Sequence, residues 1–461
     1  LIAIILASQP ARAQNVVIVS FDDLGIDGVD TYGFVNSGPT PNIDALADEG
    51  VLFRNAWANR MCSVSRAQML TGSHPTANGI GTNTSTKFND VNRNQGLNPS
   101  LPNIANVLQG NGYRTAVLGK WHLGGYGALP EILAHPNDVG FDYYAGRRNT
   151  GMFPEIAHDY FEWEKCINGI CSVSNIYRTT DTVDEAIAWI GNGDPEAFFA
   201  YVAFNAPHTP CHVPPQNLHS FGAFDDSSLS PTCHKAMVEA ADTELARLLA
   251  TINWATTTVI FLGDNGTPGD AMQWPFDPTK GKGTNYGGGI HVPLIIKGEA
   301  VSLSAEGQES EALIGVIDIF ATIMEIANIN EGTPYSESIV PYVIDPSTAS
   351  IKETLYAESF VPNGGPPRDD SYYRVARNER YVLHKHGFDP PEFYDLDVDA
   401  FEQTQLDTTN LNPQEIAAFG ELAPLVGITP VPEPGVVGST LAIASVLALM
   451  KRQRNKQKLE L

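Results

Sequence analysis

Basic residues are scarce in this chain of 461 residues, in which 28 lysines and arginines face 53 aspartates and glutamates, a formal net charge of −25. Nucleic-acid binding depends on clustered Lys and Arg that neutralise phosphates, so this charge predicts no nucleic-acid partner. The sequence also lacks internal repeats and low-complexity tracts, which excludes solenoid and fibrous folds. With 43% hydrophobic residues, the chain is long enough to bury a sizeable core as one large globular protein.

Cysteine is rare as well, with five residues in the whole chain. Four of them form two pairs that are close in sequence, Cys166 with Cys171 and Cys211 with Cys233, which predicts two disulfides in an oxidising compartment. Cys62 is left unpaired. It is either a buried structural thiol, a common state of free cysteine, or a residue with a chemical role. No cluster of Cys and His with zinc spacing is present.

Short apolar, β-branched runs alternate with segments of helical spacing, which predicts an α/β sheet with helices on both faces. We expect strands at 16–19, 115–118, 198–204 and 258–262, and helices at 42–49, 104–108, 183–190 and 235–252. In open α/β sheets ligands bind outside the carboxyl ends of the strands. The unusual side chains at these ends are therefore candidate site residues, namely Asp22, Asp23, Lys120, His208, Asp264 and Asn265.

Two polar pairs at the strand ends indicate a metal site. Asp22 and Asp23 leave the first strand, and Asp264 and Asn265 follow the strand expected at 258–262. Their side chains offer hard oxygen ligands, which suit Ca²⁺ or Mg²⁺ rather than zinc. Either pair alone is equally typical of a turn whose side chain caps its own backbone. The surrounding motifs decide between these two interpretations.

The segment around Cys62 reads MCSVSRAQMLTG over residues 61–72. It resembles the signature of the sulfatases, in which Cys or Ser is followed two positions later by Pro or Ala, then by Ser-Arg, three residues and Leu-Thr-Gly. In that family a maturase oxidises the first residue to formylglycine, an aldehyde whose hydrate attacks sulfur. The resemblance implies this modification at Cys62 and a maturase as a partner. Val64 departs from the pattern, since Pro or Ala is usual there.

Further segments resemble sulfatase motifs in the same order. GKWHLG at 119–124 matches nearly letter for letter and carries Lys120 and His122, and NAPHTP at 205–210 carries His208. Weaker family landmarks lie at 39–44, 140–146, 316–322 and 393–399. The resemblance therefore covers most of the chain.

A last motif, GKGTNYGGGIHVP at 281–293, resembles the segment with a second catalytic lysine. The spacing assigns that lysine to Lys282, with Lys280 as the rival. The motif departs from the family at Gly287, where Glu is usual, and at His291, where Arg is usual. These departures bear on how rigidly the loop of Lys282 is held.

The resemblance implies an alkaline-phosphatase-like α/β fold, with a large mixed, mostly parallel sheet flanked by helices and a small C-terminal antiparallel sheet. It implies one calcium ion per chain, held by Asp22, Asp23, Asp264, Asn265 and the modified side chain of Cys62. It also implies catalytic roles: Lys120 and Lys282 bind the sulfate, His208 protonates the leaving alcohol, His122 is the base that releases sulfate, and Arg66 orients position 62.

Both ends of the sequence predict export. Residues 1–13 read as the remnant of a signal peptide with a small-x-small cleavage site. The 16 residues 435–450 are an apolar run before a basic tail, short against the ~20 residues of a membrane-spanning helix. This order resembles the PEP-CTERM sorting signal of Gram-negative bacteria. It implies an exosortase-type partner and a periplasmic or cell-surface location, with an ordinary or transient membrane anchor as the alternative.

The expected organisation has four parts, which are a signal remnant at 1–13, a catalytic domain at 14–345, a C-terminal subdomain at 346–425, and a linker with the sorting signal at 426–461. Within the subdomain we expect a short antiparallel sheet from about residue 355 to 396. A helix is expected at 413–419.

Three classes of function follow. The leading one is an exported hydrolase of sulfate monoesters, acting on a sulfated small molecule or a sulfated polysaccharide. The alternative is a phosphate or phosphonate ester hydrolase of the same superfamily, since some formylglycine-bearing members prefer phosphorus. A third is a non-catalytic protein that binds sulfated glycans, which would follow if Cys62 were not modified. Specificity is expected to lie in the loops 73–100 and 145–180.

Overall fold

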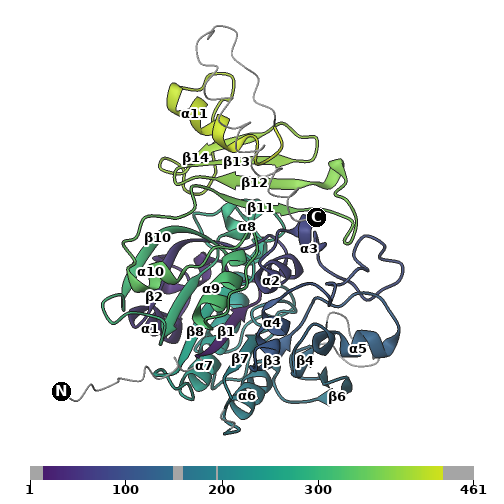
Figure 1. The fold of residues 1–461 in the computed structure, drawn as a ribbon. Coiled ribbons are helices and arrows are strands. Elements are labelled where there is room, and N and C mark those ends of the chain that lie inside the picture. Colours follow the sequence, from purple (N-terminus) through teal and green to yellow (C-terminus); the bar gives the residue numbers. More distant parts are fainter. Residues whose placement is uncertain (1–13, 149–158, 194–195, 429–461) are drawn as a thin grey trace, which may run out of the picture.

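The computed structural model describes residues 14–148, 159–193 and 196–428 (Figure 1). The predicted signal remnant and the predicted sorting signal, with its apolar run and basic tail, lie outside these residues. Among the described helices, none combines the length and the apolar character needed to cross a bilayer. The domain boundaries at 345 and 425 remain predictions.

A ten-stranded sheet forms the centre of the molecule, in the order β10-β2-β9-β8-β1-β7-β3-β4-β5-β6. Its strands are β1 (Asn15–Phe21), β2 (Val51–Trp57), β3 (Arg114–Lys120), β4 (Tyr143–Arg147), β5 (Trp163–Ile167), β6 (Ile170–Ser174), β7 (Phe198–Ala203), β8 (Thr257–Gly263), β9 (Leu294–Gly298) and β10 (Gln308–Gly315). Within this sheet β9 and β5 run against the other strands. The prediction of a mixed, mostly parallel sheet is therefore confirmed. The central strands β1, β7 and β8 are apolar runs buried along nearly their whole length, as parallel strands covered by helices are.

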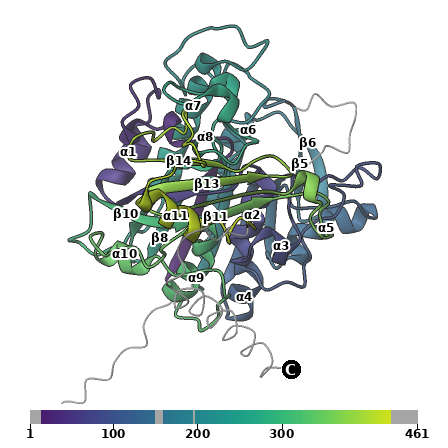
Figure 2. The same cartoon turned by 90° about the horizontal axis from the view of Figure 1, so that it is seen from above.

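Helices cover both faces of this sheet (Figure 2). They are α1 (Pro41–Asp48), α2 (Cys62–Thr71), α3 (Pro75–Asn78), α4 (Ile104–Gly110), α5 (Leu129–Asp138), α6 (Arg178–Ile190), α7 (Pro231–Leu249), α8 (Gly287–Ile290), α9 (Ile319–Ile326) and α10 (Val340–Ile344). One face is covered by α1, α6 and α7, whose side chains, such as Leu46 and Leu245, join one hydrophobic cluster. The other is covered by α2, α4 and α9, with Leu70 and Ile323 in a second cluster. The core thus has two layers, one on each side of the sheet.

The predicted helices and strands are confirmed, with ends that shift by a few residues. The helix predicted at 235–252 is α7, which begins earlier, at Pro231, because the Ser230 hydroxyl accepts a hydrogen bond from Cys233 N at 3.2 Å and caps the first turn. The prediction lacked β2, β4, β9 and β10 and the hairpin formed by β5 and β6. These strands lie on the two sides of the central block of β8, β1, β7 and β3, which was predicted.

A four-stranded antiparallel sheet forms the C-terminal subdomain, as predicted (Figure 1). Its strands are β11 (Leu355–Ser359), β12 (Tyr373–Arg377), β13 (Tyr381–His386) and β14 (Glu392–Asp395). Its outer face packs against α11 (Pro413–Leu422) through Leu383, Phe393 and Leu422. Its inner face shares a cluster with Trp57 at the end of β2 and Leu313 in β10. The small sheet therefore lies over the carboxyl ends of the main strands.

Candidate active site

Four of the predicted residues meet where β1 and β8 end. The two strands are neighbours and end in register, so Asp22 and Asp23 lie beside Asp264 and Asn265. The Asp264 carboxylate accepts a hydrogen bond from Asp23 N at 3.2 Å, and the Asn265 amide donates to Asp23 Oδ1 at 2.9 Å. All four side chains are buried. The strand pairing therefore assembles the predicted ligand set from two segments more than 240 residues apart.

Cys62 is the first residue of α2, and its side chain is fully buried beside these carboxylates. Its Sγ lies 3.2 Å from Asp22 Oδ1 and 4.0 Å from Asp23 Oδ1. Burial, and next the charge of Asp22, raise the pKa of the thiol far above its ordinary value. The unpaired N–H groups and the positive dipole end at the start of a helix favour negative charge near this position. At the other end of α2, Gly72 has a φ of 58° and provides a left-handed cap, which explains the Gly of the motif.

Arg66 lies one turn further along α2 and is 1% exposed. Its Nε donates to Asp264 Oδ2 at 2.9 Å, and its Nη1 donates to the Lys120 carbonyl at 2.9 Å. The Arg66 side chain therefore connects α2 to the residues at the ends of β8 and β3.

Two lysines reach the same carboxylates. Lys120, the last residue of β3, forms a buried ion pair with Asp22, and Lys282 forms an ion pair with Asp23. The rival Lys280 instead donates to the carbonyl of Glu402 in the C-terminal subdomain and makes no ion pair with these aspartates. The structure therefore brings Lys282, and not Lys280, to the predicted site.

The motif at 119–124 bends sharply after β3. Gly119 has a φ of 103°, and a Cβ there would lie 2.0 Å from the Ala203 carbonyl of β7, so this close approach of two strands needs glycine. His122 also has a positive φ, 54°, and its carbonyl accepts from Ser63 Oγ at 2.6 Å. Burial, and next Lys120, hold the pKa of the His122 imidazole well below its usual range. Its Nδ1 is buried and has no hydrogen-bond partner among the described residues, so the ring has a nitrogen available to accept a proton.

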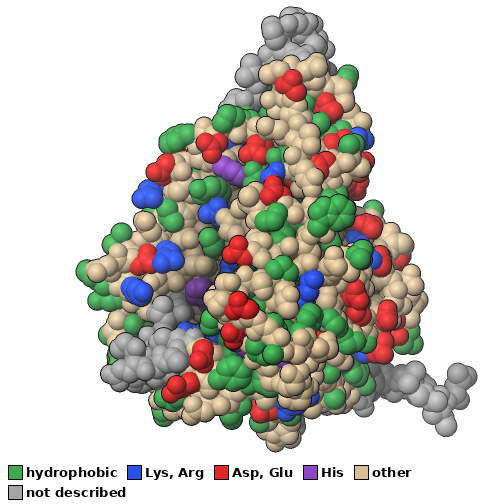
Figure 3. All heavy atoms as spheres, turned by 180° about the vertical axis from the view of Figure 1, so that it is seen from behind, with side chains coloured by type: hydrophobic (Ala, Val, Ile, Leu, Met, Phe, Trp, Pro, Cys, Tyr) green, Lys and Arg blue, Asp and Glu red, His purple; other side chains and the backbone are tan. Residues whose placement is uncertain are grey.

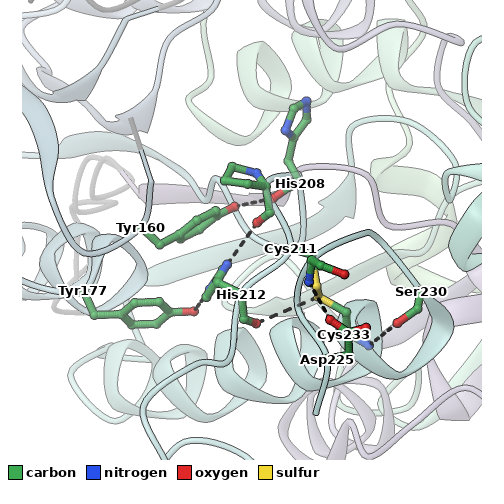
Figure 4. Close-up of a disulfide and its surroundings, with 10 residues drawn as sticks. Tyr160, Tyr177, His208, Cys211, His212, Asp225, Ser230 and Cys233 are labelled. Atoms are coloured by element: carbon green, nitrogen blue, oxygen red, sulfur yellow. Dashed lines mark hydrogen bonds between the residues drawn. A yellow bond between two sulfur atoms is a disulfide. The ribbon is translucent and has the colours of Figure 1, made fainter. Parts of the chain in front are cut away.

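His208 follows β7, and its side chain is 32% exposed. Its Nε2 lies 3.9 Å from Asp23 Oδ2. Burial lowers the pKa of its imidazole, against the opposite effect of Asp23. The phenol of Tyr160 donates to the His208 carbonyl at 2.7 Å (Figure 4) and also lies 2.8 Å from the Asn205 carbonyl, so it supports this turn. His208 is thus more exposed than Lys120 and Lys282, whose side chains are 8% and 17% exposed.

Both predicted disulfides are present. Cys166–Cys171 joins the two strands of the β5–β6 hairpin, and Cys211–Cys233 joins the segment after His208 to α7 (Figure 4). All five cysteines are described, and Cys62 is the one that remains free.

Two residues that support the site were not predicted. Tyr160 holds the turn of His208, and His234 in α7 donates from Nε2 to the Asp23 carbonyl at 2.9 Å. His234 is fully buried, and burial lowers the pKa of its ring. Neither residue belongs to a motif, although the position of His234 directly after Cys233 is a weak signal. Both act through backbone carbonyls, which a sequence pattern does not reveal.

The donor set fits a divalent cation. Carboxylate oxygens of Asp22 and Asp23, the sulfur of Cys62 and a ring nitrogen of His208 lie within 4.8 Å of one another. Asn265 Oδ1 is buried and has no hydrogen-bond partner among the described residues. A buried amide oxygen without a donor suits a hard cation such as Ca²⁺. The sequence predicts His208 only as an acid, whereas the structure also brings it next to the ligand set.

A cavity of about 830 Å³ lies elsewhere, at the junction with the C-terminal subdomain, where Trp57, His74 and Tyr356 are among its lining residues. None of the predicted site residues lines it. The candidate site is therefore defined by converging side chains and not by the volume of this cavity.

A helix that presents position 62 to acidic side chains at the carboxyl edge of a mostly parallel sheet defines the alkaline-phosphatase-like class of proteins. The Sulfatase family model matches residues 14–329, and the chain belongs to the sulfatase family. N-acetylgalactosamine-6-sulfatase of Rattus norvegicus is 29% identical over 369 residues, 73% of this chain and 66% of that protein. The chain thus spans about two thirds of the length of this relative.

Solved structures share the fold. Ps i-CgsB in complex with k-i-k-neocarrahexaose has a TM-score of 0.73 at 23% identity, over 89% of this chain and 92% of that chain. BT4656 in complex with D-glucosamine-2-N,6-O-disulfate has a TM-score of 0.71 at 18% identity, over 90% of this chain and 97% of that chain. At these identities the likeness shows the architecture alone.

Proposed function

We propose that this protein hydrolyses sulfate monoesters, with formylglycine made from Cys62 and one divalent cation, calcium, in the site. The observation that carries the proposal is the position of Cys62. Its Sγ lies 3.2 Å from Asp22 at the start of α2, between the ion pairs that Lys120 and Lys282 make with the aspartates. Family membership supports the modification, since sulfatases generally use formylglycine and a divalent metal.

Asp22, Asp23, Asp264 and Asn265, with the modified side chain at position 62, would hold the cation. When bound, it would lower the pKa of a hydroxyl at position 62 and supply an oxygen nucleophile for attack on sulfur. Oxygen ligands favour calcium or magnesium over zinc. The three carboxylates are matched by Lys120, Lys282 and Arg66, so a divalent cation leaves the site net positive. Such a site suits the single charge of a sulfate monoester.

The side chains of the chain itself would bind the ester and move the protons. Lys120 and Lys282 would bind sulfate oxygens, where negative charge accumulates in the transition state. His208 would give the departing alcohol oxygen a proton from Nε2 as the imidazolium, because its Nδ1 donates to the Thr209 carbonyl at 2.8 Å. His122, half-buried and with a pKa held well below its usual range, would take a proton at its unpaired Nδ1 when sulfate leaves. Each such proton transfer typically contributes 10²–10⁴-fold.

The test of function is sulfate release by the full chain, co-expressed with a formylglycine-generating maturase. We expect kcat/KM for an aryl sulfate to exceed that for the matching aryl phosphate, which carries close to two charges near neutral pH. Peptide mass spectrometry should find formylglycine at position 62 in the active enzyme. Faster cleavage of phosphate esters than of every sulfate ester would favour the phosphorus branch of the superfamily. Sulfated-glycan binding with unmodified Cys62 and no turnover would favour a binding protein.

The metal is tested by removing calcium from the enzyme and then adding it back. A chelator selective for calcium should abolish activity, and calcium should restore it. Elemental analysis should give one calcium per chain, and Asp264→Ala should remove both the metal and the activity while the circular dichroism spectrum stays that of the wild type. Two zinc ions per chain would contradict this assignment.

The substrate is proposed to be a sulfated saccharide. The support is the N-acetylgalactosamine-6-sulfatase of rat, 29% identical to this chain. A panel that includes N-acetylgalactosamine 6-sulfate, algal glycans and glycosaminoglycans, with an aryl sulfate as reference, would identify the preferred class. Turnover of the aryl sulfate alone would contradict a saccharide substrate.

Export is proposed from the predicted signal remnant and sorting signal. The two disulfides agree with an oxidising compartment, since such bonds rarely persist in the cytosol. Fractionation of a Gram-negative host should place the chain in the periplasm or at the cell surface, with the tail at 435–461 removed by an exosortase-type enzyme. Retention in the cytoplasm would contradict the proposal.

A further inference from the structure

The loop that carries Lys282 is rich in glycine. Five of the ten residues from Lys280 to Gly289 are glycines, and glycine loses more conformational freedom on ordering than any other residue. The main domain restrains the loop through backbone bonds from Lys282 N to the Thr267 carbonyl at 2.9 Å, from Gly283 N to the Arg60 carbonyl at 3.1 Å, and from Gly266 N to the Gly289 carbonyl at 2.9 Å. The position of the Lys282 ammonium therefore depends on what holds the ends of the loop.

Glu402 of the C-terminal subdomain holds both ends. Its Oε2 accepts a hydrogen bond from Gly287 N at 2.8 Å, and its backbone carbonyl accepts one from the Lys280 ammonium. The residue is 3% exposed, and its φ of 55° is uncommon for a residue with a side chain. Since these two contacts flank Lys282, one residue brackets the catalytic lysine.

A second set of contacts orients the Glu402 carboxylate. His384 Nε2 in β13 lies 3.2 Å from Glu402 Oε1, and the His384 ring packs on Tyr286, with the ring centroids 4.6 Å apart. Tyr286, the neighbour of Gly287, donates its phenol proton to Glu392 at 2.8 Å. The small sheet thus contacts the loop through side chains of two of its strands as well as through Glu402.

Glu402 also accounts for an unusual glycine. Position 287, where the sulfatase pattern has Glu, is Gly here, and a Cβ built on it would lie 3.9 Å from Glu402 Oε2. An acidic side chain at 287 would place a second carboxylate beside that of Glu402. The carboxylate beside position 287 therefore comes from Glu402, which lies 115 residues later in the chain.

We propose that Glu402 is a positioning residue of this enzyme, which fixes the loop from Lys280 to Gly287 so that Lys282 stays against Asp23. The C-terminal subdomain is then part of the catalytic apparatus. The inference rests on the proposed role of Lys282, and it adds that this role requires a contact made by a different subdomain.

The kinetic test compares Glu402→Ala and Glu402→Gln in the full, modified chain with Glu379→Gln, which alters an exposed carboxylate of the same subdomain. A displaced catalytic group costs up to ~10²-fold. We expect Glu402→Ala to lower kcat/KM for an aryl sulfate roughly 10–100-fold. Glu402→Gln keeps an acceptor oxygen for Gly287 N and should lose less. Glu379→Gln should stay within about twofold of wild type, since surface changes are usually neutral.

A double-mutant cycle separates positioning from general damage to the fold. If Glu402 acts through Lys282, Glu402→Ala should cause no further loss of kcat/KM in the Lys282→Ala background. Fully additive losses would overturn the proposal. If Glu402→Ala does not fold, the same double-mutant cycle is measured with Glu402→Gln.

Hydrogen exchange gives a readout that does not depend on activity. Amides of residues 280–291 should exchange at least about tenfold faster in Glu402→Ala than in wild type or Glu379→Gln, because Gly287 N loses its acceptor there. Unchanged exchange would overturn the proposal. A wild-type protein without sulfatase activity would contradict the proposed function, and this measurement would still decide the structural contact.

Discussion

Lys280 and Lys282 carry the same charge and lie two residues apart, yet their ammonium groups have different partners. Lys282 pairs with Asp23, whereas Lys280 donates to the carbonyl of Glu402 and to the Tyr394 phenol. Only the first partner belongs to the predicted ligand set. The chemical role of a lysine in this loop is thus decided by the direction of its side chain.

The two lysines give a matched pair of variants. We expect Lys282→Ala to lower kcat/KM for an aryl sulfate about 10²–10³-fold, the usual loss for one group that stabilises transition-state charge. Lys280→Ala should lose less than about tenfold, because it removes one contact that supports the loop. Steady-state kinetics with thermal unfolding as a fold control would check this. The reverse order of losses would return Lys280 to the catalytic role.

Val64 belongs both to the signature around Cys62 and to the hydrophobic core. The side chain is fully buried in the cluster beneath α2, although the sulfatase pattern has Pro or Ala at this position. We expect Val64→Ala to raise the yield of formylglycine with a foreign maturase and to lower the free energy of unfolding by ~1–3 kcal/mol through the cavity it leaves. Val117→Ala, equally buried in the same cluster, should lose stability without a change in yield. Peptide mass spectrometry and urea titration measure both effects, and equal yields in the two variants would contradict the prediction.

At the scale of elements, α7 supports the site from two directions. The Cys211–Cys233 disulfide links it to the segment after His208 (Figure 4). His234 of the same helix donates a hydrogen bond to the Asp23 carbonyl at 2.9 Å. The hairpin disulfide Cys166–Cys171 makes no such link. The two disulfides therefore differ in what they connect, although both join cysteines that are close in sequence.

Removal of each disulfide tests this difference. The pair Cys211→Ser and Cys233→Ser should lower kcat/KM about tenfold for a sulfate ester with a poor leaving alcohol, because the turn of His208 loosens and proton transfer matters most there. The matched pair Cys166→Ser and Cys171→Ser should leave kcat/KM within about twofold, since it lacks a link to the site. Equal losses in both variants would show that the effect is general.

A buried carboxylate joins α7 to α1. Asp242 accepts hydrogen bonds from Asn42 and from Ile43 N at 2.8 Å, and burial raises the pKa of its carboxyl to about 6. Because the pKa is higher in the folded than in the unfolded chain, this group favours folding at low pH, and the contribution disappears as pH rises through about 6. From pH 4 to 7 the unfolding free energy of wild type should fall by about 2 kcal/mol relative to Asp242→Asn, since the unfolded carboxyl is already partly ionised at pH 4. Urea titrations at both pH values check this, and parallel pH dependence would contradict it.

At the scale of the whole molecule, the acidic excess has to coexist with an anionic substrate. The face shown in Figure 3 carries many acidic side chains with fewer basic ones between them, in line with the formal charge of −25. The lysines of the site are paired with aspartates inside the fold, so the long-range field is repulsive to anions. The positive groups of the site attract an anionic substrate only at short range.

Salt should therefore help a polyanionic substrate. We expect kcat/KM for a polysulfated glycan to rise several-fold between about 10 and 150 mM NaCl, as screening shortens the range of repulsion to ~8 Å. A singly charged aryl sulfate should change by less than about twofold, because repulsion grows with the charge of the substrate. Stopped assays at matched pH would measure both. A fall in kcat/KM with salt would indicate an attractive patch that steers the glycan.

Local sequence determined much of this protein. The apolar, β-branched runs of β1 and β8 predicted buried strands, and the polar residues at their ends could be read from the sequence pattern. Short motifs predicted Cys62, Lys120 and His208 as site residues, because each lies in a segment that resembles a sulfatase motif. The close pairs of cysteines likewise predicted both disulfides.

Only the tertiary structure decided which distant groups meet. The strands β2, β9 and β10 gain their stability from partners far along the chain, so their own residues gave a weaker signal. The hydrogen bond from Gly287 to Glu402 spans 115 residues, and that between Asn265 and Asp23 spans 242. Such pairs form because packing brings sheet ends and subdomains together. No local preference of either partner encodes the other, and the assembly of the site therefore depends on the fold.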